Sequence, residues 1–193
     1  FDGVNDYINV SDSNSLDLPG AWTLGAWVNV SSSQTSYGEI IAKRGTSGTN
    51  YALRTNGNSW DCYFYNGTGW AGAWGIGTVH KGAWHYMTCA YDGINTIKIY
   101  ENGTLIGSSN VGPAPLANIE PVIIGATNYG SGPVENLTGL IDEVKIWNRA
   151  LNSSEIQQEY LRTTIGINSN EGCAADENLT LRLGGLTDSL ISN

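Results

Sequence analysis

Short runs of alternating apolar and polar residues account for most of the chain. Such alternation is typical of β-strands with one buried face, and it is clearest at residues 22–30 and 139–147. Because no helical period appears before residue 153, the pattern predicts an all-β sandwich of two antiparallel sheets with one short C-terminal helix. The other predicted elements are strands at 1–10, 39–43, 51–54, 60–65, 84–91 and 121–126 and a hairpin at 96–107 around Asn102-Gly103.

Two local features depart from simple alternation. Residues 66–82 contain Trp70, Trp74 and several glycines but no apolar period, so we expect an irregular segment there. The helix has a clear start signal, because Asn152 followed three residues later by Glu155 resembles a capping box with Asn in the first position.

One polar residue interrupts the closing run at 139–147. Asp142 alternates with Leu140 and Val144, so it shares their pleat face, and this face is predicted to point into the core. A carboxylate is costly there unless it is paired, hydrogen-bonded or bound to a metal ion. The residues that we expect to be buried between or against the sheets are Trp27, Ile99, Val144 and Ile146.

Three blocks of the sequence carry a resemblance to a known family. They are FDGVNDYINV at 1–10, WHYMTCAYDG with IKIYENG at 84–103, and GLIDEVKIWNRAL with SSEI at 139–156. In this order they resemble the concanavalin A-like, laminin-G-like jelly-roll domains. The resemblance implies one jelly-roll domain over residues 1–161. Residues 162–193 are expected to be a linker and the start of a following module, or an appended strand.

Composition narrows the function classes. Only nine Lys and Arg balance 18 Asp and Glu, and no basic cluster exists, so we expect no nucleic-acid partner. No apolar run is long enough to span a membrane. Seven Trp and ten Tyr against two Phe favour rings with a polar edge, which are common where a surface meets a ligand but also serve in strands and cores.

Cysteine and asparagine patterns bear on the cellular context. Cys62 and Cys89 lie in predicted strands and are either paired or buried as free thiols, while Cys173 lies in the tail. Asn-x-Ser/Thr sequons exceed the number expected by chance and favour a secreted, N-glycosylated surface protein, although turn composition also produces such motifs. Because the chain begins inside a predicted strand, we expect a longer precursor. The sequons begin at Asn9, Asn29, Asn66, Asn102, Asn136, Asn152 and Asn178.

The sequence contains no recognisable catalytic set, so we expect no enzyme activity. Related jelly-roll glucanases carry acidic residues at alternating positions of one strand, whereas Asp142 and Glu143 are adjacent and point to opposite faces. His80 and His85 match no nucleophile motif.

The acidic residues of the first predicted strand, together with Asp142, favour the hypothesis of a calcium site. The resemblance implies that the first and last strands pair, which would bring the N-terminal acidic residues to Asp142, and it implies backbone ligands such as the carbonyl of Gly3. The alternative is that Asp6 and Asp142 cap turns or accept backbone N–H groups. The predicted set is Asp2, Gly3, Asn5, Asp6 and Asp142.

Aromatic residues of the middle region are candidates for a ligand face, because sugar rings stack on aromatic rings. Asp61 and Asn66 would then bind hydroxyl groups; the alternative is that the rings fill the core or cover a neighbouring module. The predicted ligand residues are Trp60, Asp61, Tyr65, Trp70 and Trp74.

Taken together, the sequence predicts a non-catalytic, extracellular adhesion or recognition module of a larger multidomain or filamentous surface assembly. Its expected partner is a carbohydrate or a surface protein, and its expected cofactor is structural calcium. The rival interpretations are an accessory carbohydrate-binding domain of a glycan-degrading enzyme and a structural domain of a surface filament or layer.

Overall fold

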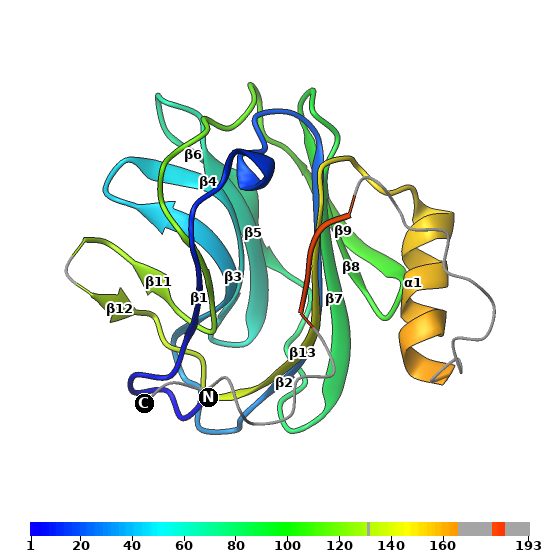
Figure 1. Ribbon diagram of the computed structural model, residues 1–193. Helices are drawn as coiled ribbons and strands as arrows, with labels where there is room; N and C mark the ends of the chain where they lie inside the picture. Colours follow the sequence, from blue (N-terminus) through cyan, green and yellow to red (C-terminus); the bar gives the residue numbers. More distant parts are fainter. Residues whose placement is uncertain (131, 166–178, 184–193) are drawn as a thin grey trace.

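The computed structural model describes residues 1–130, 132–165 and 179–183 of the chain, and in it two six-stranded sheets lie face to face (Figure 1). This arrangement confirms the predicted antiparallel sandwich. The first sheet has the order β1 (Ile8–Val10), β10 (Val122–Ile124), β3 (Tyr37–Gly45), β4 (Gly48–Asn56), β5 (Ser59–Tyr65) and β6 (Trp70–Ile76). The second has the order β14 (Leu179–Leu183), β13 (Gly139–Trp147), β2 (Trp22–Val30), β7 (Trp84–Tyr91), β8 (Thr96–Glu101) and β9 (Thr104–Asn110).

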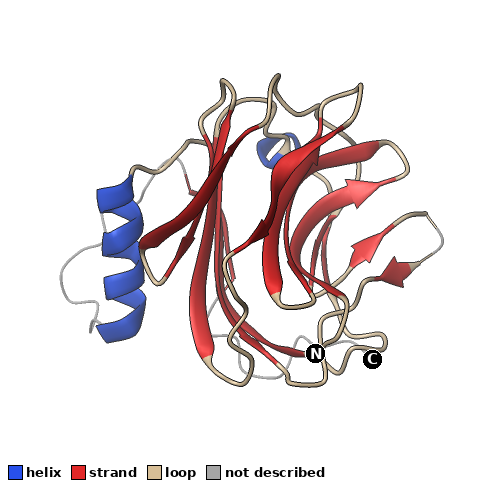
Figure 2. Ribbon diagram, turned by 180° about the vertical axis from the view of Figure 1, so that it is seen from behind, coloured by secondary structure: helices blue, strands red, loops and turns tan. Residues whose placement is uncertain are grey.

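Smaller elements flank the sandwich on opposite sides (Figures 1 and 2). Helix α1 (Ser153–Ile165) lies outside the second sheet, whereas the hairpin of β11 (Thr127–Asn128) and β12 (Pro133–Val134) lies outside the first. A short 3-10 helix, η1 (Asn14–Leu16), follows β1. The outer face of the second sheet is therefore partly covered by the helix, while the outer face of the first sheet is bordered by the hairpin.

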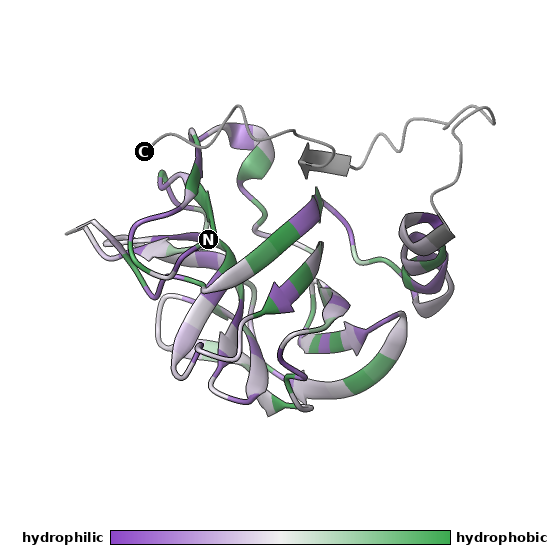
Figure 3. Cartoon of the chain, turned by 90° about the horizontal axis from the view of Figure 1, so that it is seen from below, coloured by the Kyte–Doolittle hydropathy of each residue, from purple (hydrophilic) through white to green (hydrophobic). Residues whose placement is uncertain are grey.

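Side chains alternate between the two faces of each strand, and hydrophobic and hydrophilic residues alternate along the strands (Figure 3). The hydrophobic faces of the two sheets therefore form the core between them. Trp22 of β2 is fully buried, with its ring centroid 6.0 Å from that of Tyr51 in β4 and 5.9 Å from that of Tyr91 in β7. These rings join the two sheets, because Tyr51 belongs to the first and Tyr91 to the second. Ile99, Val144 and Ile146 are buried as predicted.

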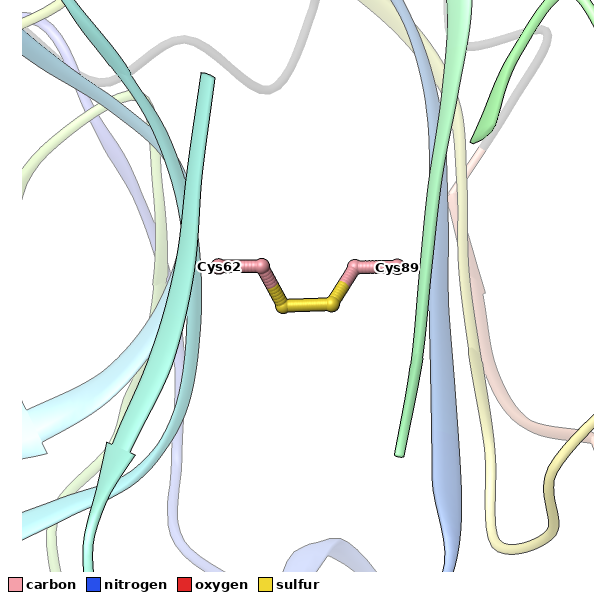
Figure 4. The surroundings of a disulfide bond; sticks show 2 residues. All are labelled: Cys62 and Cys89. Atoms are coloured by element: carbon pink, nitrogen blue, oxygen red, sulfur yellow. A yellow bond between two sulfur atoms is a disulfide. The ribbon is translucent and has the colours of Figure 1, made fainter. Parts of the chain in front are cut away.

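A disulfide crosses this core and joins the two sheets. Cys62 of β5 and Cys89 of β7 point toward each other from facing strands (Figure 4), with their Cα atoms 6.4 Å apart. Of the two states that the sequence left open for these cysteines, the structure has the paired one. Cys173 lies outside the described residues.

Trp27, which was expected to be buried between or against the sheets, lies on the outer face of the second sheet. Trp22 and Val28 point inward, so alternation places Trp27 on the opposite side of β2. There it is half-buried near α1, with its ring centroid 5.6 Å from Tyr86 and 5.8 Å from Tyr160 of the helix.

The start of α1 has the predicted cap. The side-chain oxygen of Asn152 accepts hydrogen bonds from the N–H groups of Ser154 (2.9 Å) and Glu155 (3.0 Å). The carboxylate of Glu155 accepts the N–H of Asn152 at 2.7 Å in return. Behind this cap, Ile156 is fully buried in a small outer cluster with Tyr100 and Trp147.

The predicted position of Asp142 in the core is wrong. A β-bulge shifts the register between Asp142 and Lys145, and Glu143 adopts φ +48° there. An extra residue in a strand moves the following side chains to the other face. Before the bulge, Ile141 packs toward the core and Asp142 is exposed; after it, Val144 is buried.

The expected pairing of the first and last strands is also wrong. β1 is shorter than predicted, and it pairs with β10 in the first sheet, whereas β13 pairs with β2 and β14 in the second. Only the extreme N-terminus approaches β13, through an isolated bridge between Asp2 and Thr138. At the other end of the chain, α1 continues past residue 161, and residues 179–183 form an added strand beside β13.

Candidate ligand-binding face

The outer face of the first sheet carries a set of charged and aromatic side chains. Cys62 of β5 points into the core, so Asp61 and Tyr63 on either side point away from it. Strand register places Arg54 of β4 opposite Asp61 on one side and opposite Glu39 of β3 on the other. Alternation within neighbouring strands therefore brings these groups together on one surface.

Arg54 links the acidic residues of this face. Its Nε donates to Asp61 Oδ2 at 3.2 Å, and its Nη1 donates to Glu135 Oε2 at 3.1 Å. The guanidinium also lies 3.8 Å from the ring centroid of Tyr37, within cation–π range. Asp61 is fully buried, and its second carboxylate oxygen accepts the N–H of Gly75 at 2.9 Å. These contacts fix Arg54 and Asp61 beneath the surface.

Glu39 is a fully buried carboxyl group next to this link. The hydroxyl of Tyr63 donates to Glu39 Oε1, and the Nη1 atoms of Arg44 and Arg54 lie 3.7 Å and 3.9 Å from the same oxygen. Burial disfavours the charged form and raises the pKa of Glu39 from 4.5 to about 8, although the Tyr63 hydrogen bond and the arginines oppose the shift. At neutral pH the neutral acid is therefore the main form of Glu39.

A surface hollow of about 240 Å³ lies at the end of this face, where β3 turns into β4. Arg44 is part of its wall, with its guanidinium carbon 4.6 Å from the ring centroid of Trp70 and 4.2 Å from that of Tyr129. The hollow thus combines one cation, two aliphatic hydroxyl side chains and three aromatic rings. Its lining residues are Arg44, Gly45, Thr46, Ser47, Gly48, Tyr65, Trp70 and Tyr129.

Two tryptophans of β6 extend the aromatic surface beyond the hollow. Trp70 is 50% exposed and Trp74 is 43% exposed. Both pack on Tyr63, with ring centroids 5.7 Å apart in an edge contact for Trp70 and 5.0 Å apart in a stacked contact for Trp74. Gly72, between them, permits this packing, because a Cβ atom there would lie 2.6 Å from that of Tyr63. Both rings are therefore held by packing while keeping large exposed areas.

This arrangement suits a ligand with apolar faces and a hydroxylated edge. Aromatic rings provide a flat apolar surface, and Thr46 provides a hydroxyl group that donates or accepts hydrogen bonds. The hydroxyl of Ser47 donates to Glu120 Oε1 at 2.8 Å and keeps its capacity to accept a hydrogen bond. Arg44 supplies N–H donors, and its contacts with Tyr63, Trp70 and Tyr129 hold it in place. Ordered polar groups around an apolar surface are typical of small-ligand sites.

The predicted ligand residues have different positions. Tyr65 and Trp70 line the hollow, and Trp74 lies on the same outer face. Trp60 is fully buried in the core, so its predicted contact with a ligand is wrong; alternation with Asp61 turns it inward. Asp61 is buried beneath Arg54 and does not reach the surface.

Sequence reasoning missed several residues of this face because they lie on different strands, and no regular spacing in the sequence shows that they come together. Glu39 and Asp61 were isolated acidic residues in the sequence, and only the strand register joins them through Arg54. The segment 66–82, expected to be irregular, contains strand β6 at Trp70–Ile76, which orients both exposed tryptophans. The residues missed entirely are Arg44, Arg54, Tyr63, Tyr129 and Glu135.

The carboxylates proposed for calcium do not assemble as a set. Asp6 Oδ2 accepts the N–H of Asp2 at 3.0 Å, and Asp2 Oδ1 accepts that of Val4 at 2.8 Å. Asp142 instead accepts the N–H of Glu143 at 2.7 Å on the exposed side of β13. Within the described residues no group of three or more His, Cys, Asp or Glu side chains is placed to hold a metal ion. Asp142 thus does not fit the predicted site, and calcium binding by Asp2, Gly3, Asn5 and Asp6 stays a prediction.

The predicted glycosylation sites differ in how accessible they are. Asn9 and Asn152 are exposed, whereas Asn29, Asn66, Asn102 and Asn136 are partly buried. The side-chain N–H of Asn136 already donates to Val4 O at 2.9 Å. Asn66 accepts hydrogen bonds from Thr68 and Gly69 within a turn, so it serves local structure rather than the hollow. Asn178 lies outside the described residues, and glycosylation itself stays a prediction.

Comparison with known proteins identifies the family and the fold. The family described as the concanavalin A-like lectin/glucanases superfamily matches residues 2–157, which confirms the resemblance seen in the sequence. No significant match exists among curated proteins. No helix in the described part of the chain is long and apolar enough to cross a membrane.

Solved structures with the same fold belong to larger chains. A Bacteroides ovatus protein described as a candidate carbohydrate binding protein has 20% identity and a TM-score of 0.69, covering 93% of this chain and 49% of its own. The botulinum neurotoxin serotype G binding domain has 14% identity and a TM-score of 0.65, with 84% and 42% covered. For the binding domain of Paraclostridial Mosquitocidal Protein 1 the values are 13%, 0.60, 80% and 40%. This chain thus spans half or less of the length of these neighbours.

Proposed function

Because this chain belongs to the concanavalin A-like lectin/glucanase superfamily, we propose that it is a non-catalytic carbohydrate-binding module. The observation that carries this proposal is the hollow on the outer face of the first sheet, where Arg44 lies between the rings of Trp70 and Tyr129. A sugar ring stacks on exposed aromatic area there, and its hydroxyl groups meet Arg44, Thr46 and Ser47. The fold shared with a candidate carbohydrate binding protein supports the same ligand class.

The carboxyl groups of this face favour binding over hydrolysis. Glycoside hydrolysis generally requires two carboxyl groups that flank the scissile bond. Glu39 and Asp61 are fully buried, and Glu135 accepts hydrogen bonds from Arg54 at 3.1 Å and from the hydroxyl of Tyr129 at 2.6 Å. These groups hold the arginines and tyrosines in place, which is a role suited to a rigid binding surface.

Two features outside the hollow support a proposal about the cellular context. The Cys62–Cys89 disulfide favours an oxidising compartment, and the exposed sequons at Asn9 and Asn152 are accessible to glycosylation. We infer an extracellular glycoprotein in which this chain is one module of a larger surface protein. The remaining roles are an accessory domain beside a glycan-degrading module and a structural domain of a surface layer.

The proposal predicts the effect of removing one ring from the hollow. On an array of immobilised neutral and acidic oligosaccharides, the wild-type chain is expected to bind a defined subset. Trp70→Ala is expected to weaken binding of the best of these by roughly 10- to 100-fold, because the variant loses the exposed stacking surface. Isothermal titration calorimetry with the soluble oligosaccharide measures the change.

Trp84→Ala is the matched control for this experiment. Trp84 is 42% exposed, close to the value for Trp70, but it lies on β7 of the second sheet. It is expected to leave the affinity within about twofold of wild type. Equal losses in the two variants, or no binding to any oligosaccharide by wild type, would refute the assignment of the hollow. Release of reducing sugar from a bound glycan would refute the non-catalytic role.

A further inference from the structure

Lys43 of β3 is fully buried, and its ammonium group is enclosed by oxygen atoms from two separate segments. Its Nζ lies 2.6 Å from Asp12 Oδ1 and 3.2 Å from Asp17 Oδ1, both near η1. It also donates to the backbone carbonyls of Asn118 at 2.9 Å and Glu120 at 2.6 Å. The side chain of Lys43 has no exposed area.

Two carboxylates and two backbone carbonyls around one point form the kind of ligand set that hard cations such as Ca²⁺ use in proteins. Their formal charge is −2, whereas the ammonium of Lys43 supplies +1. Asp17 Oδ1 is buried and receives no hydrogen bond, so its interaction with Lys43 is an ion pair only. We call these four oxygen ligands the Lys43 cage. With the ammonium inside, the cage keeps a net charge of −1, whereas a divalent ion in the same place would neutralise it.

We propose that this cage is a cation site in which the ammonium of Lys43 takes the place of a bound divalent metal ion. The built-in cation fastens the segment before β2 and the loop before β10 to the middle of the first sheet. That loop borders the hollow: Asn118 Nδ2 donates to Gly48 O at 3.3 Å, and Glu120 Oε1 accepts the hydroxyl of Ser47 at 2.8 Å. Lys43 is thus a positioning residue that keeps this edge ordered without metal.

Shortening Lys43 is expected to turn the cage into a real calcium site. In Lys43→Ser the two carboxylates and two carbonyls remain while the ammonium is removed, so EDTA-treated protein is expected to melt well below wild type. Addition of calcium is expected to raise the melting temperature of this variant by several degrees more than it raises that of wild type. Terbium emission on excitation of the protein's aromatic rings is expected to increase in Lys43→Ser above wild type, because Tyr51 lies near these carboxylates.

Two further variants test whether the calcium response of Lys43→Ser arises at this cage. Lys98→Ser removes an exposed lysine of β8 and is expected to respond to calcium as wild type does. Lys43→Ser with Asp12→Asn removes one ligand and is expected to lose most of the gained response. A Lys43→Ser variant that folds but gains neither a calcium-dependent melting shift nor terbium emission would overturn the proposal.

If Lys43→Ser does not fold, NMR of the wild-type protein tests whether the ammonium of Lys43 is enclosed. An enclosed ammonium exchanges its protons slowly, so in ¹⁵N-lysine-labelled protein Lys43 is expected to give an Nζ–H signal at neutral pH that Lys98 lacks. Asp12→Asn is expected to shift this signal. The absence of the Lys43 signal, or its indifference to Asp12→Asn, would contradict the enclosure on which the proposal rests.

Discussion

Breaking the Cys62–Cys89 disulfide is expected to lower the melting temperature by roughly 7 to 14 °C, which is one of the two largest effects predicted for this chain. The bridge spans 27 residues and joins β5 of one sheet to β7 of the other. In the chain-entropy view, closing a loop of this length restricts the unfolded chain and stabilises the fold by about 3.5 kcal/mol. For a chain of this size each kcal/mol shifts the melting temperature by roughly 2 to 4 °C.

Calorimetry of wild-type protein with and without reductant measures this effect. The double variant Cys62→Ser/Cys89→Ser is the control, and it is expected to melt at or below the temperature of the reduced wild type because it also buries two hydroxyl groups. Reductant is expected to have no comparable effect on the double variant. A change of less than about 2 °C on full reduction of wild type would contradict the stabilising role of the bridge.

Replacing Glu39 with Gln is expected to remove a large pH dependence of stability. Burial raises the pKa of Glu39 to about 8 in the folded chain, from an ordinary value of 4.5. Between these two values the folded state keeps a proton that the unfolded state has released, so folding becomes less favourable as the pH rises. The contribution is complete below about pH 4.5 and is lost above about pH 8, at up to about 1.4 kcal/mol per pH unit in between.

Denaturant titrations of the two proteins at pH 5.5 and pH 7.5 test this sign. Wild type is expected to lose roughly 2 to 3 kcal/mol of unfolding free energy through Glu39 across this interval. In Glu39→Gln this component is absent, because a neutral amide replaces the acid and its carbonyl still accepts the Tyr63 hydroxyl. Equal pH slopes for the two proteins, or a wild type that gains stability through Glu39 as the pH rises, would show that the buried group is ionised throughout.

Strand alternation was enough to predict the sandwich and much of its core. In the run Trp22–Val30 the period of two puts Trp22 and Val28 on one face, and the structure shows that this face points into the core. Trp27, which was expected to be buried between or against the sheets, lies on the face opposite to Trp22 and is only half-buried. On the outer face its indole ring packs against the rings of Tyr86 and Tyr160, which cover part of its apolar surface.

Backbone irregularities limited the prediction of the calcium site. A strict period of two put Asp142 in the core, but the bulge at Glu143, with φ +48°, reverses the faces between Ile141 and Val144. The sequence gives no sign of this bulge, because glutamate rarely adopts a left-handed conformation and would not be expected at a position with positive φ. The chemical argument from a buried carboxylate therefore had no structural basis.

The candidate binding face depended on contacts that are distant in the sequence. Tyr65, Trp70 and Trp74 could be proposed from the sequence because sugar rings stack on aromatic rings. Arg44 and Tyr129 are separated in the sequence by strands of both sheets, and the approach of the β11–β12 hairpin to β3 brings them to the same hollow. Long-range pairing of this kind leaves no local signal.

The most direct test of the central claim is to follow the tryptophan indole N–H signals of ¹⁵N-labelled protein during titration with the best-binding oligosaccharide. The chain has seven tryptophans, assignable by single substitutions, and they report on different surfaces. The indole signal of Trp70 is expected to shift most, followed by that of Trp74. The buried Trp22 and Trp60 and the exposed Trp84 of the second sheet are expected to stay unchanged. A saturating shift of Trp84 with an unchanged Trp70 would contradict the account.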